Sequence, residues 1–81
     1  MSKTRSLSEL KTGKTAIIRG LRGGYGFRSR LAALGFTPGT KITMLQNLGR
    51  GPIIVALRDT RIALGRGEAK KVLIESMGNG K

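Results

Sequence analysis

Short apolar segments are separated by glycine-rich and polar stretches along most of this chain of 81 residues. Several of these segments alternate apolar and polar positions or are rich in β-branched residues, which is typical of strands. The predicted strands are residues 15–19, 41–45, 53–57, 61–64 and 72–74. Their spacing of about ten residues indicates a small all-β fold. The pattern therefore predicts a mainly β domain, a small and partly open barrel of about five strands.

One segment has the period of a helix instead. Phe27, Leu31 and Leu34 lie at positions i, i+4 and i+7, so they share one face of a helix over residues 27–34. Gly35 directly after it is a natural stop, because glycine readily adopts the left-handed conformation that ends many helices. We expect one short α-helix, inserted after the first strand, with this apolar face toward the interior.

Turn residues separate the later strands. Within residues 37–40, Pro38 sets φ and Gly39 can supply a positive φ. Residues 58–60 are short enough to join the flanking strands as a hairpin. Residues 53–57 form the most apolar run of the chain, and we therefore take them as the central strand.

The length of the chain allows one domain. We assign residues 7–75 to this domain and expect solvated, flexible tails over residues 1–6 and 76–81. Within the domain, residues 7–10 are expected to form one helical turn, and residues 65–71 a polar connector able to form a 3₁₀ turn.

Charge and missing residue types limit the functions open to such a domain. The 16 Lys and Arg residues against 4 Asp and Glu residues give a formal net charge of +12. An acidic partner is therefore expected: nucleic acid, an anionic membrane surface or an acidic protein face. Because the chain has no Cys and no His, a disulfide framework, a thiol nucleophile and a histidine base are excluded. The carboxylates occur singly, so we expect no enzyme, no catalytic residue, no cofactor and no metal site.

The segment over residues 31–45 resembles the central motif of the FeoA family, ferrous iron transport protein A. In that family a helix ends in Leu/Met-Gly-hydrophobic and is followed by x-Pro-Gly and an alternating strand. The residues that carry this structural motif here are Leu31, Leu34, Gly35, Pro38 and Gly39. The resemblance extends over residues 7–75, although Gly51 stands where the family has an acid before proline.

The resemblance implies an SH3-like β-barrel with a helical insertion. It also implies a cytoplasmic accessory, peripheral to the inner face of the cell membrane, that binds the cytoplasmic part of a FeoB-type permease. Such a permease is membrane-embedded, hydrolyses GTP and carries Fe²⁺, and the accessory is not itself a catalyst. Iron binding by this chain is not expected, since Fe²⁺ sites usually draw on imidazole and carboxylate ligands. Met44, at a strand position, is expected in the core.

A partner-binding surface is expected around the predicted helix. Small residues on its outer face would let a partner approach, arginines would meet acidic groups, and large apolar residues flank it in loops. The candidate residues are Leu21, Arg22, Tyr25, Arg28, Arg30, Ala32, Ala33 and Phe36. An ordinary solvated helix face is the alternative.

Three other partners remain open. A small basic barrel could bind nucleic acid, but Tyr25, Phe27 and Phe36 do not lie at strand positions suited to stacking, so nucleic acid is not favoured. An anionic membrane surface is compatible with a permease partner. The exposed apolar patch would also allow self-association.

Overall fold

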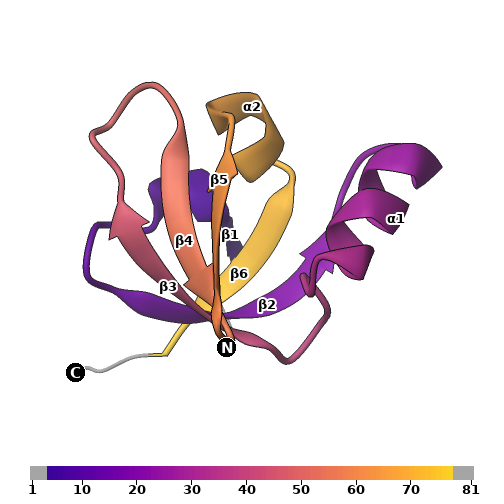
Figure 1. The fold of residues 1–81 in the computed structure, drawn as a ribbon, viewed down its shortest axis with the longest axis horizontal. Helices are drawn as coiled ribbons and strands as arrows, with labels where there is room; N and C mark the ends of the chain where they lie inside the picture. Colours follow the sequence, from indigo (N-terminus) through magenta and orange to yellow (C-terminus); the bar gives the residue numbers. More distant parts are fainter. Residues whose placement is uncertain (1–3, 78–81) are drawn as a thin grey trace.

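The computed structural model describes residues 4–77 and contains one antiparallel sheet of six strands in the order β1-β6-β2-β3-β4-β5 (Figure 1). The strands are β1 (Thr4–Ser6), β2 (Thr15–Leu21), β3 (Lys41–Gln46), β4 (Ile53–Leu57), β5 (Thr60–Leu64) and β6 (Val72–Ser76). The helices are the 3₁₀ helix η1 (Leu7–Glu9) and the α-helices α1 (Tyr25–Ala33) and α2 (Arg66–Ala69). Strands β1 and β5 are the two edges, so the sheet is not a closed barrel.

The core lies on the face of the sheet where alternate strand residues point inward. On β2 the buried residues are Ala16 and Ile18, and on β3 they are Ile42 and Met44. This period of two is the one expected for half-buried strands. The other buried residues are Leu7, Leu10, Leu31, Phe36, Ile53, Val55, Leu57, Leu64, Ala69, Val72 and Ile74. The placement of Met44 in the core is confirmed.

Two strand predictions were wrong. Residues 53–57 do form a strand, but β4 lies next to the edge strand β5, and β2 and β3 occupy the middle of the order. The structure has one strand more than the five predicted: β1, which lies in residues assigned to the N-terminal tail. Its Thr4 pairs with Glu75 of β6. Its three residues, Thr-Arg-Ser, are all polar, so hydrophobic patterning could not predict this strand. Main-chain pairing with β6 is what forms it. Residues 1–3 and 78–81 of the expected tails lie outside the described residues.

Two connections behave nearly as expected. Strands β4 and β5 form the predicted hairpin, with Leu57 opposite Thr60 and Arg58 at a positive φ of 56°. The connector over residues 65–71 contains α2, which is α-helical rather than 3₁₀. At its start the Glu68 carboxylate accepts a hydrogen bond from the main-chain N–H of Gly65 at 3.0 Å, which satisfies one of the free donors of the first turn.

Candidate partner-binding surface

Helix α1 projects beyond the sheet on the side away from the β3–β4 loop (Figure 1). It begins at Tyr25, two residues before the predicted start, and ends at Ala33. Of its nine residues only Leu31 is buried. A helix with so little of its surface in the core presents most of its side chains to solvent.

Phe36 does not belong to the exposed surface, contrary to the prediction. Its side chain is fully buried, and its N–H donates to the Leu31 carbonyl at 3.0 Å. Gly35 makes this possible, since its φ of 110° reverses the chain at the end of α1. A Cβ at that position would lie 2.9 Å from Leu57 Cδ2. The turn therefore returns the chain to the core at Phe36, where an exposed loop position was expected.

Leu34 and Leu21 exchange the environments expected for them. Leu34, predicted on the buried face, is the C-terminal cap of α1 and is 47% exposed. Leu21, predicted in an exposed loop, is the last residue of β2 and packs partly buried against the core. Both changes follow from where the elements end, which hydrophobic periodicity places least well.

The other candidates are exposed as expected. Tyr25 has 79% of its surface exposed, the largest value among the bulky apolar side chains of residues 4–77. The exposed candidates are Arg22, Tyr25, Arg28, Arg30, Ala32 and Ala33. Together with Leu34, these six residues are called the α1 surface below. It combines large apolar groups, small residues and cations.

Half-buried Phe27, in the first turn of α1, contacts Lys71 in the segment that follows α2. The Arg30 guanidinium lies 5.8 Å and the Lys71 ammonium 5.0 Å from the Phe27 ring centroid, within the range of cation–π attraction. Arg30 Nη2 also donates to Glu68 Oε2 at 2.5 Å. The Gly65 N–H and then this Arg30 contact hold the pKa of Glu68 below its usual value. Arg30 is therefore engaged within the fold, and Arg28 is the α1 arginine more available to a partner.

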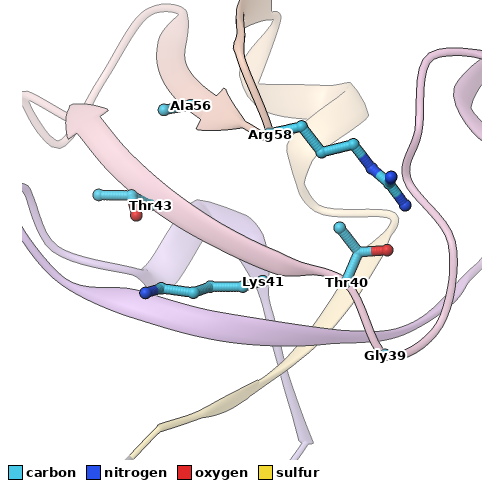
Figure 2. A pocket seen from close by; sticks show the side chains of 6 residues that line it. All are labelled: Gly39, Thr40, Lys41, Thr43, Ala56 and Arg58. Atoms are coloured by element: carbon cyan, nitrogen blue, oxygen red, sulfur yellow. The ribbon is translucent and has the colours of Figure 1, made fainter.

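A shallow depression of about 500 Å³, which the sequence did not indicate, opens on the outer face of the sheet between β3 and β4 (Figure 2). Arg58 and Lys41 extend at opposite ends of it, and its remaining lining residues are Gly39, Thr40, Thr43 and Ala56. These residues come together through the antiparallel register, in which Thr43 lies opposite Ala56. No sequence spacing could have shown this. The charged residues of this lining are both cations, Lys41 and Arg58, and it contains no carboxylate.

Within residues 4–77 no group of three or more carboxylate, imidazole or thiol side chains gathers to hold a metal ion. No helix in this range is both long and apolar enough to cross a membrane.

These observations define the class: a small SH3-like domain with an exposed helix inserted between its second and third strands. The FeoA domain model matches residues 5–76, and the chain belongs to the FeoA family. FeoA proteins are small accessories of ferrous iron transport rather than known catalysts.

Two curated relatives share this domain. A protein of Methanocaldococcus jannaschii with the provisional name Fe(2+) transport protein A is 33% identical over 69 residues, covering 85% of this chain and 83% of the relative. An Fe(2+) transport protein A/Fe(2+) transporter FeoB fusion protein of Porphyromonas gingivalis is 37% identical over 70 residues. That match covers 85% of this chain but only 8% of the fusion protein.

Among solved structures, FeoA of Stenotrophomonas maltophilia, crystallised with zinc and described as an SH3 domain protein, has the same fold. It superposes with a TM-score of 0.77 at 31% sequence identity, covering 85% of this chain and 87% of that one. The predicted SH3-like class and the resemblance to FeoA are thus confirmed.

Proposed function

We propose that this protein is a cytoplasmic accessory of a FeoB-type ferrous iron permease and that it binds the cytoplasmic part of that permease through the α1 surface. In this role it supports Fe²⁺ transport at the inner face of the membrane without catalysing a reaction itself.

The observation that carries this proposal is the fusion protein of Porphyromonas gingivalis. There a domain 37% identical to this chain is part of one polypeptide with the Fe(2+) transporter FeoB. Covalent linkage raises the effective concentration of one module around the other, which benefits modules that act on each other. A separate chain must achieve the same proximity through a binding surface.

The α1 surface is suited to this task. Tyr25 and Leu34 are large, exposed apolar groups at the two ends of α1, and Arg28 lies between them on the same helix. Aromatic and arginine side chains carry much of the binding energy at protein interfaces. Ala32 and Ala33 allow a partner to approach the helix backbone closely.

The test is capture of the cognate permease from detergent-solubilised membranes by the immobilised protein. Tyr25→Ser combined with Arg28→Glu should weaken capture about tenfold or more, because it removes an exposed aromatic group and reverses a charge that forms no ion pair within residues 4–77. The matched control is Arg61→Glu, the same charge reversal at an exposed position on β5. In cells, the double variant should also lower uptake of radiolabelled Fe²⁺.

Both variants change exposed side chains only, so circular dichroism should report a wild-type fold. Wild-type capture and uptake by a folded double variant would refute the α1 surface as the docking site. Failure of the wild-type protein to capture the permease, together with a salt-dependent gel shift of nucleic acid, would instead support the nucleic-acid alternative.

A further inference from the structure

The loop over residues 47–52, between β3 and β4, displays a leucine at its tip. Leu48 has 75% of its surface exposed, and Leu45 at the end of β3 is 39% exposed. In Figure 1 this loop lies at the end of the molecule opposite α1, so it is not part of the α1 surface. Exposure of a leucine on a flexible loop is common, but this loop is held in place by hydrogen bonds.

Asn47 is the centre of that hydrogen bonding. Its Nδ2 donates to the carbonyls of Ser8 at 3.0 Å and Leu10 at 2.8 Å. Its Oδ1 accepts from the Gly49 N–H at 3.0 Å and from Arg66 Nη2 at 2.6 Å. One side chain therefore joins the start of the loop to η1 and α2 and also curls the loop itself.

Arg66 of α2 holds the other end of the loop. Its Nε donates to the Gly51 carbonyl at 3.2 Å, and its Nη1 donates to the Ser8 carbonyl at 3.3 Å. With both ends fixed, Leu48 is presented to solvent by an ordered loop. The conformational entropy of that segment is thus already lost before any partner binds.

Exposed cations lie in this loop and in the neighbouring turn over residues 11–14. Arg50 lies in the loop itself, and Lys11 and Lys14 lie in a turn held against β3. In that turn the Gly13 N–H donates to the Met44 carbonyl at 2.7 Å, and the Met44 N–H donates to the Lys14 carbonyl at 2.9 Å. We call Leu45, Leu48, Lys11, Lys14 and Arg50 the Leu48 surface.

Cations outnumber carboxylates at this surface. Asp59, Glu68 and Glu75 lie in the β4–β5 turn, in α2 and in β6. Glu9 in η1 is exposed and lies between Ser8 and Leu10, whose carbonyls accept from Asn47, and it accepts a hydrogen bond from the Ser6 hydroxyl at 3.5 Å. The Leu48 surface is an apolar tip with three cations, and Glu9 is the one carboxylate of residues 4–77 placed at its border.

We propose that the Leu48 surface binds anionic lipid, with Leu48 entering the boundary between headgroups and acyl chains and the three cations meeting lipid phosphates. Apolar groups beside basic residues bind membrane interfaces in this way. A lipid surface suits a protruding tip better than an acidic protein does, since an interface anchor usually needs a partner pocket and a lipid interface needs none. Lipid binding is additional to docking on a permease, because the Leu48 surface lies at the end of the molecule opposite the α1 surface.

The test is cosedimentation of the full chain with vesicles of phosphatidylcholine alone or mixed with phosphatidylglycerol. The wild-type protein should bind only the mixed vesicles. Leu48→Ser should reduce this binding by at least about tenfold, the effect expected for exposing one buried leucine side chain. The matched control Leu34→Ser, the same change at the exposed leucine of α1, should leave vesicle binding unchanged.

A pair of double variants separates a local site from the overall positive charge. Lys11→Gln with Arg50→Gln should weaken binding to the mixed vesicles more than Lys41→Gln with Arg58→Gln, which removes the same charge from the depression of Figure 2. Equal losses would mean that net charge alone binds the lipid, and they would overturn the proposal. Unchanged vesicle binding by Leu48→Ser would also overturn it, and loss of permease capture by that variant would then point to a protein occupant.

Discussion

Replacing Gly35 by alanine tests how α1 is joined to the core. Gly35 has a φ of 110°, a conformation that residues with a side chain rarely adopt. A Cβ there would also stand 2.9 Å from Leu57 Cδ2. Leu57 is only 1% exposed, so its side chain has little room to move away.

The two effects can be given magnitudes. Backbone strain at such a φ costs about 1–3 kcal/mol, and forcing an extra methyl group against a packed core costs about 1–3 kcal/mol. We expect Gly35→Ala to lower the free energy of unfolding by about 2–6 kcal/mol. In a domain this small that is a large share of a total of about 5–10 kcal/mol, and the variant should be partly unfolded.

The assay is urea denaturation followed by far-ultraviolet circular dichroism, with Gly39→Ala as the matched control. Gly39 has a φ of 92°, but a Cβ there meets no atom within 4 Å, so only the strain is expected. Gly35→Ala should therefore be the more destabilising variant by about 1–3 kcal/mol. Equal losses would show that Leu57 gives way, and a negligible loss in both would refute the strain argument.

Two further predictions concern polar contacts. Asn47→Ala should lower the free energy of unfolding by about 2 kcal/mol, because several partly buried hydrogen bonds are lost. It should also speed amide hydrogen exchange over residues 47–52. Unchanged exchange would contradict the role of Asn47 in ordering this loop. Glu68→Gln should lower stability at neutral pH by about 0.5 kcal/mol, since the Arg30 contact is exposed. The Gly65 N–H and Arg30 lower the pKa of folded Glu68, so its contribution is present above the ordinary value of 4.5 and is lost as the pH falls through the lowered pKa. Denaturation curves of both proteins should accordingly converge in acid, and a constant gap would contradict the assignment.

The candidate surface shows where local sequence reasoning works and where it fails. Tyr25 and Arg28 are exposed as predicted. Their neighbours on that side of α1 are small or polar, so this side of the helix has no apolar face to pack against the core. Phe36 was misplaced because hydrophobicity cannot reveal which way the chain runs after a glycine with positive φ. The link of Arg30 to Glu68, 38 residues apart, exists only once α1 and α2 are positioned.

The order of residues alone determined the mainly β class, the inserted helix, the Pro38–Gly39 turn and the family, because periodicity, turn chemistry and motif spacing are local properties. Tertiary structure decided which strands are central, that Thr4–Ser6 pairs with β6, and how Asn47 and Arg66 order the loop that carries Leu48. These depend on register and on contacts between distant segments. Such contacts form only when the whole chain is folded, so no single stretch of sequence contains them.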